Sequence, residues 1–563
     1  MQRLFFSIFI CLITSLANAQ ATKTLAGDQS TGTSTWSKDT VYILDGFVFV
    51  DSLETLTIEA GTVIKGVPGQ GADASALIVA RGGTIIAQGT ASAPIIFTAQ
   101  ADDLANPFDI AENTRGLWGG VLILGNAPLN STPGQSQVEG LPTEKSFGLY
   151  GGNDSQDDSG IFSYASIRYG GTNIGSGNEI NGLTLAGVGS ATQIDHVEVI
   201  FNKDDGVEFF GGNPNTSYMV TAFCGDDAFD YDEGFDGLGQ FWFVVQSDSA
   251  GSDRGGEHDG GTDPETASPF ATPVIYNATY IGRGEAAGKR ALTFRDNAGG
   301  EYHNSIFMDY GKGVDIEILG NGGTHSFDRL LAGNLKVENN IFWNVAGNDS
   351  TEIFQITPAK YVGQTLAADS AMIVDSAAII VRGKFLNAGN LAQDPLFANV
   401  EDSSRLAGYY KLDPRPGWDG PAFQSTKSPY PADPFYKSVN YKGAFDNSAD
   451  LWLRGWTLLD EMFYIPTNLT SLEEELAAQF DMTVAPNPNN GRFSVTLQNL
   501  TPAENVKFTL FNLQGQLVDI KSAMPTESRL EVDFNTSNIA AGLYILKVVQ
   551  GQTFVGLDRI LIK

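Results

Sequence analysis

The stretch that decides the fold is HVEVIFNKDDGVEF, residues 196–209, which recurs 22 positions later as YMVTAFCGDDAFDY, residues 218–231. The overlay pairs Val197 with Met219, Phe201 with Phe223, Asp204-Asp205 with Asp226-Asp227, Val207 with Phe229, Glu208 with Asp230 and Phe209 with Tyr231. A strand-rich repeat of about 20–25 residues is too short for a propeller blade, which needs about 40–45. It fits one coil of a parallel β-helix, in which stacked coils supply each other's hydrogen bonds and core.

Further copies extend this pattern from about residue 42 to residue 445. HNSIFMDYGKGVDI, residues 303–316, is a third copy, with His303 and Gly313 each 107 positions after His196 and Gly206. The runs LTIEAGTVIKG, from Leu56, and LIVARGGTIIAQGT, from Leu77, are typical of first coils. We expect Val, Ile and Phe to point inward, and Gly and Asn to take the corners, where a positive φ costs them little. An open apolar end must be covered, and we expect the aromatic group Phe445, Trp452, Trp456 and Phe463 to cap the far end.

The two ends of the chain differ from this body. Residues 481–563 alternate apolar and polar positions between short turns rich in Gly, Asn and Pro, which is typical of a small antiparallel β-sandwich. At the other end, Arg3 precedes an apolar run and Ala17-Asn18-Ala19 supplies a small-x-small cleavage pattern. We therefore predict a signal peptide over residues 1–19, too short for a membrane span. The mature chain keeps only Cys224 and so has no internal disulfide.

Composition excludes several classes of partner. The 563 residues carry a formal net charge of -32, so nucleic acid and anionic membranes are repelled. Disorder is excluded as well, because 42% of the residues are hydrophobic and 11% are aromatic.

Only residues 471–480 have the periodicity of a helix, which we expect to link the body to the C-terminal sandwich.

Two resemblances follow from these motifs. The body is similar to secreted, pectate-lyase-like right-handed β-helix proteins common in Bacteroidota, through LTIEAGTVIKG, LIVARGGTIIAQGT, DDGVEFFGG and GDDAFDYDEGF. The C-terminal segment resembles the sorting domain of the type IX secretion system, through its Pro486-Asn487-Pro488 opening, its Gly542-Leu543-Tyr544 strand and its basic last residue. This second resemblance implies export by the type IX machinery to the medium or the outer cell surface.

Together these observations predict an all-β protein, a right-handed parallel β-helix followed by a small C-terminal antiparallel β-sandwich. The expected domains are a signal peptide (1–19), the β-helix body with its aromatic cap (20–470), a linker helix (471–480) and the sorting domain (481–563).

The densest cluster of candidate ligands is acidic. It comprises Asp204, Asp205, Glu208, Asp226, Asp227, Asp230, Asp232, Glu233 and Asp236. If the two repeats are adjacent coils, equivalent carboxylates lie about 4.8 Å apart and repel by about 3–4 kcal/mol at an effective dielectric of 20. A surplus of hard oxygen ligands suits Ca²⁺. The alternative interpretation, that these residues form solvated turns, stays open.

The sequence assigns no catalytic residue. A β-helix lyase needs a basic side chain near its metal, and the candidates are Lys203, Arg283, Lys289, Arg290 and Arg295. In so acidic a chain we expect these cations to form ion pairs. Two hypotheses therefore remain. The first is a non-catalytic adhesin or scaffold that binds a polysaccharide or surface glycan, and the second is a Ca²⁺-assisted polysaccharide lyase or glycoside hydrolase.

Overall fold

The fold is described from a computed structural model. It describes residues 20–563 except 139–140, 142–145, 176–177, 248–250, 262–263, 320–323, 360–369, 401–411, 449–450, 463, 466–480, 513–516, 537 and 552. The predicted signal peptide, the predicted linker helix and Phe463 lie outside the described residues.

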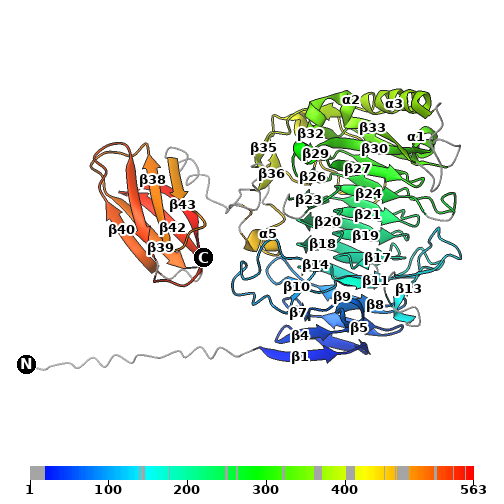
Figure 1. Cartoon of the computed structure of the whole chain (residues 1–563), viewed down its shortest axis with the longest axis horizontal. Coiled ribbons are helices and arrows are strands. Elements are labelled where there is room, and N and C mark those ends of the chain that lie inside the picture. The colour runs from blue at the N-terminus through cyan, green and yellow to red at the C-terminus, as the bar shows by residue number, and fades with distance from the viewer. Residues whose placement is uncertain are drawn as a thin grey trace, which may run out of the picture.

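The body consists of parallel strands stacked coil upon coil (Figure 1). One face is an 11-stranded sheet made of β2 (Gln29–Ser30), β5 (Phe47–Val50), β8 (Ala76–Val79), β11 (Val121–Leu124), β17 (Leu183–Ala186), β19 (Val207–Phe210), β21 (Phe229–Asp232), β24 (Gly256–Asp259), β27 (Arg290–Arg295), β30 (Lys312–Leu319) and β33 (Phe354–Ala359). The prediction of a parallel β-helix is confirmed.

The rest of each coil belongs to a 19-stranded sheet that bends along its length. Its strands are β1 (Ala21–Ala26), β3 (Ser34–Trp36), β4 (Thr40–Asp45), β6 (Thr55–Ile58), β7 (Val63–Gly66), β9 (Thr84–Gln88), β10 (Ile95–Ala99), β14 (Gly160–Arg168), β18 (Gln193–Ile200), β20 (Asn215–Ala222), β22 (Leu238–Gln240), β23 (Phe243–Val245), β25 (Val274–Tyr276), β26 (Thr279–Ile281), β28 (Gly300–His303), β29 (Ile306–Tyr310), β31 (Leu335–Glu338), β32 (Ile341–Val345) and β34 (Leu391–Ala392). Minor pairs are β12 (Ser136–Gln137) with β13 (Leu149–Tyr150), β15 (Asn173–Gly175) with β16 (Asn178–Glu179), and β35 (Phe397–Asn399) with β36 (Asp413–Pro416).

The strand register confirms the overlay of the two repeats. Val197 lies opposite Met219 in the β18–β20 pair, and Glu208 lies opposite Asp230 in the β19–β21 pair. The third copy matches only in part. Gly313 takes the place of Gly206, whereas His303 is in line with the residue before His196, because the connection between the two faces differs by one residue.

The corner of the bent sheet differs from the expectation of Gly and Asn. Its left-handed positions are Tyr164, His196, Tyr218 and Phe241, with φ of 49, 51, 55 and 59°, before Asn277, Asn304 and Asn339 take over in later coils. The aromatic rings stack from coil to coil, with centroids 4.1 to 4.9 Å apart. Coil spacing matches ring stacking, and this contact offsets the backbone strain that a non-glycine residue carries there.

The prediction of an aromatic end cap is wrong in its location. Trp452 and Trp456 pack edge-on along the side of the aromatic corner, with Trp456 5.9 Å from His196 and Trp452 5.2 Å from Tyr218. Phe445 likewise lies against Phe243 on the side of the body.

The far end is covered by a helix, α3 (Ser370–Leu386), which packs on β33. Phe385 of α3 lies 4.9 Å from Phe354, and Ala377 and Val381 are buried on the same side of the helix. The sequence did not indicate this helix because its apolar residues are spread around the axis instead of forming one stripe. The other helices are short: α1 (Ser326–Ala332), α2 (Ser350–Ile353), α4 (Pro421–Gln424) and α5 (Leu458–Glu461), with 3₁₀ turns at Gly71–Asp73, Ser146–Gly148, Glu285–Ala287 and Ala346–Asn348.

An ion pair fastens α5 to the side of the body. Arg168 of β14 is buried and makes two hydrogen bonds to Glu461, at 2.9 and 2.8 Å. The buried Glu198 carboxylate accepts the backbone N–H groups of Leu458 and Leu459. These contacts hold the C-terminal part of the body against the coils.

The C-terminal segment is an antiparallel β-sandwich with its own core, as predicted. One sheet contains β37 (Asp481–Ala485), β38 (Arg492–Gln498) and β41 (Leu530–Asn535), and the other contains β39 (Val506–Asn512), β40 (Leu517–Ala523), β42 (Gly542–Gln550) and β43 (Thr553–Ile562). Among the described residues, no helix is long and apolar enough to cross a membrane.

Candidate functional site

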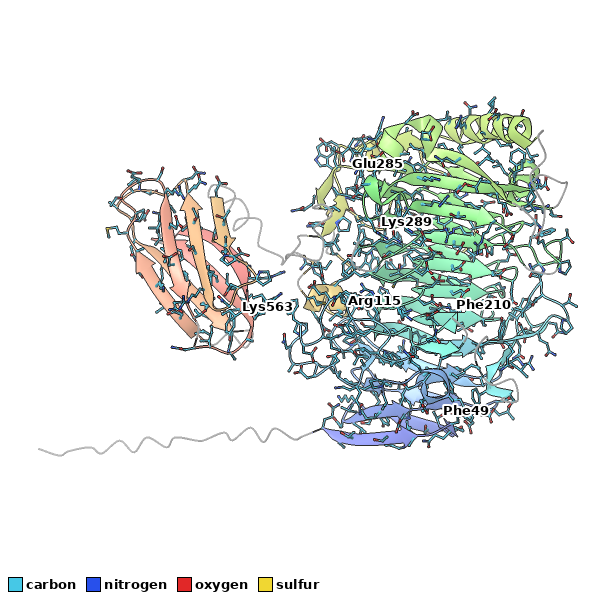
Figure 2. All side chains as sticks on the ribbon, viewed as in Figure 1. Phe49, Arg115, Phe210, Glu285, Lys289 and Lys563 are labelled. Carbon is cyan, nitrogen blue, oxygen red and sulfur yellow. The ribbon has the colours of Figure 1, made fainter. Side chains whose placement is uncertain are left out.

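An acidic face runs across the outer side of the 11-stranded sheet. Alternate residues of a strand point to opposite sides, so Phe209 and Tyr231 enter the core while their neighbours point outward. The register aligns two outward rows of residues. One row contains Glu208, Asp230, Glu257, Thr293 and Asp315, and the other contains Phe210, Asp232, Asp259, Arg295 and Glu317. Figure 2 shows Phe210 at this face, where its ring lies 6.0 Å from that of Tyr150.

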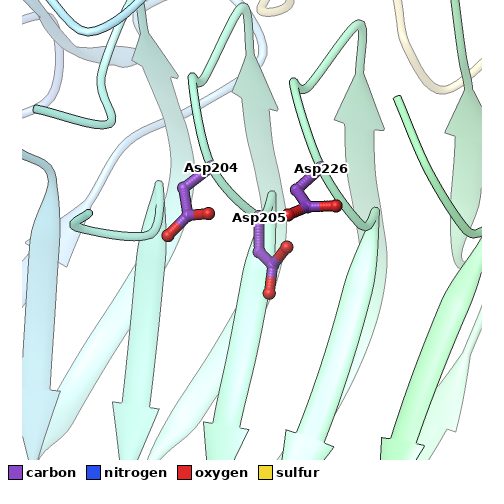
Figure 3. Close-up of side chains that lie close together, drawn as sticks. All are labelled: Asp204, Asp205 and Asp226. Atoms are coloured by element: carbon purple, nitrogen blue, oxygen red, sulfur yellow. The ribbon is translucent and has the colours of Figure 1, made fainter. Parts of the chain in front are cut away.

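The turns that lead into β19 and β21 add four carboxylates to the edge of this face. Asp204, Asp205 and Asp226 come from two consecutive coils and lie close together (Figure 3). One carboxylate oxygen of each residue lies within 4.8 Å of a carboxylate oxygen of each of the other two. The same is true of Asp205, Glu208 and Asp230, and of Asp226, Asp227 and Asp253. Six of the nine predicted ligands are thus brought together.

The negative charge of the inner triad, Asp205, Glu208 and Asp230, is poorly compensated by the surrounding residues. Asp205 accepts the backbone N–H of Asp227 at 2.8 Å, and Glu208 accepts the Asn181 amide. Asp230 Oδ1 is buried and has no hydrogen-bond partner among the described residues. Within the described chain no Lys, Arg or His forms an ion pair with any of the three. The triad is therefore a pocket of unbalanced negative charge.

The pKa values of the cluster reflect this environment. Burial, followed by repulsion from neighbouring carboxylates, raises the pKa of Asp205, Glu208 and Asp230 well above their ordinary values. The same causes raise the pKa of Asp204 to about 7 and that of Asp226 to about 6. Without a compensating cation, Asp204 and Asp226 take up protons near neutral pH, and the three inner groups hold theirs above the pH at which an ordinary carboxyl ionises.

The outer triad consists of Asp226, Asp227 and Asp253. It differs from the inner triad because cations surround it. Arg254 lies 3.1 Å from Asp227 and 3.4 Å from Asp253, and Lys289 lies 2.9 Å from Asp253. Asp253 was not identified from the sequence. It lies in a coil 27 residues long, beyond the 22-residue overlay that revealed the other carboxylates.

The remaining predicted ligands lie outside the three triads. Asp232 is further along β21 and accepts the Glu233 N–H at 2.6 Å, while burial and the charge of Asp259 raise its pKa to about 7. Tyr150 is hydrogen-bonded to the Glu233 side chain, and Asp236 accepts the Thr272 hydroxyl at 2.9 Å.

The candidate basic residues contact carboxylate or carbonyl groups, and the ion pairs expected from the sequence are present. The pairs are Lys203 with Glu179, Lys289 with Asp253, Arg290 with Asp315, and Arg295 with Glu257 and Asp259. Arg283 donates to the Ser252 carbonyl. All the cations of this face that the sequence singled out are thus held in place by acceptors.

Comparison with known proteins agrees with the architecture. A family model described as a pectate-lyase like beta helix domain matches residues 27–377, more than half of the chain. A second, described as a secretion system C-terminal sorting domain, matches residues 483–563 and indicates a secreted or cell-surface protein that meets the type IX machinery. Neither a curated protein nor a solved structure gave a match. The chain belongs to the family of proteins built on a pectate-lyase like β-helix domain.

Proposed function

We propose that the protein is a non-catalytic surface scaffold whose acidic face binds Ca²⁺ and, through it, a glycan. The observation that carries this proposal is the inner triad, Asp205, Glu208 and Asp230, with its unpartnered buried oxygen on Asp230. A buried charge without a partner costs several kcal/mol. A divalent cation between the three carboxylates would remove that cost.

The carboxylate oxygens of the triad are hard ligands of the kind that Ca²⁺ and Mg²⁺ take, and the size of the ion sets how far apart they lie. Ca²⁺ holds oxygen ligands at 2.3–2.6 Å, so two oxygens on opposite sides of the ion are at most about 5 Å apart. Mg²⁺ holds its ligands at 2.0–2.1 Å, which limits the same separation to about 4 Å. The triad oxygens lie within 4.8 Å of one another, which is inside the range that Ca²⁺ spans.

The engaged cations favour a scaffold over a lyase. A lyase base must be free to take a proton from the sugar, whereas Arg290 and Arg295 are ion-paired with Asp315 and Asp259. One observation supports glycoside hydrolysis as the second candidate. Glu257 is hydrogen-bonded to Asp227 and lies 2.8 Å from Arg295, and burial together with the charge of Asp227 outweighs this cation and raises the pKa of Glu257 to about 9. A carboxyl that stays protonated at neutral pH is what a general acid requires.

Calcium titration of the mature chain tests the proposal. We expect calorimetry to give one strong site, lost in Asp230→Asn and kept in Asp253→Asn. Asp253 is the matched control because Lys289 and Arg254 already compensate its charge. Equal loss in both variants, or no calcium binding at all, would contradict the assignment of the inner triad.

Glycan binding is tested separately. On a glycan array we expect retention that EDTA abolishes and Ca²⁺ restores. The same glycans are then incubated with the protein and analysed for unsaturated products by ultraviolet absorbance and for new reducing ends. Either product would show that the protein is an enzyme and not a non-catalytic scaffold.

Export is tested by removing the sorting domain. A chain truncated before Met482 should remain in the periplasm of its host, because the segment matched as a sorting domain is missing. Release of the truncated body into the medium would contradict this role.

A further inference from the structure

The outer side of the cap helix α3 is an exposed apolar surface. Ile379, Ile380 and Leu386 are 69, 41 and 46% exposed. The opposite side of the same helix is buried against the last coil. Figure 1 shows α3 at the end of the body that lies opposite β1.

We propose that this surface is the interface between two copies of the chain, joined end to end by antiparallel pairing of their α3 helices. A two-fold axis makes such a contact self-complementary, since each residue meets its counterpart twice. If the axis passes between Ile379 and Ile380, Ile379 of one copy faces Ile380 of the other across the contact. Ser376 then faces Gly383.

The charges on the helix flank fit this arrangement. Asp375 and Arg382 are seven residues apart, two helical turns, and so lie on the same flank of α3. In an antiparallel pair the same flanks meet, so Asp375 of one copy comes beside Arg382 of the other. Within the described part of the chain neither residue forms an ion pair. The second copy supplies an ion-pair partner for each of them.

Gly383 is a second, independent sign of a close neighbour. A glycine inside a helix costs about 1 kcal/mol relative to alanine, and in the single chain nothing lies within 4 Å of the position that a Cβ would take. The single chain therefore gives no steric reason for glycine at this position. A second helix crossing here gives one, because the missing side chain lets the two backbones approach.

The size of the patch predicts a weak dimer. A 17-residue helix is about 25 Å long, so the contact is smaller than the roughly 800 Å² per partner of a standard interface. We expect a dissociation constant in the micromolar range, which a concentration series detects.

Sedimentation velocity of the mature full chain at 1–200 µM tests the proposal. We expect a monomer–dimer equilibrium that Ile379→Asp weakens at least tenfold, while Leu53→Asp, at a 93% exposed site far from α3, changes nothing. Gly383→Leu should also abolish the dimer without lowering the melting temperature, because the monomer has room for the side chain and leucine favours a helix more than glycine does.

A charge exchange makes the test specific for the antiparallel register. Arg382→Asp alone should weaken the dimer, and adding Asp375→Arg should restore it. A monomer at 200 µM, a dimer insensitive to Ile379→Asp, or no rescue in the double variant would overturn the proposal. Binding of the monomer to lipid vesicles through the same residues would assign the patch to a membrane instead.

Discussion

Asp230→Asn should change the stability of the protein in opposite directions with and without calcium. The substitution keeps the shape of the side chain and removes one charge from the inner triad. In EDTA at pH 8 we expect the variant to be more stable than the natural chain. In excess Ca²⁺ we expect the natural chain to be the more stable of the two.

The magnitude follows from the geometry of the triad. At 4.8 Å and an effective dielectric of 20, two like charges repel by about 3–4 kcal/mol, and Asp230 faces both Asp205 and Glu208 within that distance. Partial protonation relieves much of this repulsion, because burial raises the pKa of all three groups. We therefore expect a gain of about 2–3 kcal/mol in the free energy of unfolding at pH 8.

The sign of the pH dependence is fixed by the raised pKa values. The folded state binds more protons than the unfolded state once the pH exceeds about 4, so the natural chain loses stability as the pH rises from there through the raised pKa values. In Asp230→Asn this loss should be smaller, and at pH 4 the two proteins should be nearly equal. Calcium at 100 times its dissociation constant stabilises the natural chain by about 2.7 kcal/mol.

Urea unfolding of the mature chain at pH 4, 6 and 8, with EDTA or with Ca²⁺, measures both effects. If Asp230→Asn is the less stable protein in EDTA at pH 8, the carboxylate makes a structural hydrogen bond and the triad is not an unbalanced charge. If Ca²⁺ stabilises both proteins equally, the ion binds elsewhere.

Three further variants test the packing of the body. Glu461→Gln should lower the free energy of unfolding by about 2–3 kcal/mol, because Arg168 is buried and loses its charged partner; an unchanged urea midpoint would show that this pair contributes nothing. Phe209→Ala should cost about 3–5 kcal/mol, since the ring is buried and stacks 4.3 Å from Phe235, whereas Phe210→Ala on the outer side should cost far less. Equal losses in these two variants would contradict the inward orientation of Phe209. Lys442→Met should stabilise the chain at pH 7, because the Lys442 amine is buried without a partner and burial lowers its pKa to about 7. The natural chain should gain stability between pH 7 and 10, as the unfolded state then binds more protons, and the variant should lack this gain; parallel pH profiles would contradict the assignment.

Much of the candidate site could be read from the repeat, and the part that was missed has a geometric cause. Asp205, Glu208 and Asp230 were found because consecutive coils of equal length place equivalent residues side by side. Asp253 and Glu257 escaped because their coil is longer and its sequence no longer overlays. Which carboxylates are compensated could not be predicted at all, since Arg254 and Lys289 reach them only across coils.

The sequence by itself determined the stacking of the coils, their inward apolar rows and the C-terminal sandwich, because each depends on short-period patterns that one strand imposes on the next. Only the tertiary structure decided what covers the coils. The aromatic residues Trp452 and Trp456 fit both an end and a side of the body, and edge-on packing against His196 and Tyr218 selected the side. The end is covered by α3, whose burial against Phe354 depends on tertiary contacts that no local sequence pattern predicts.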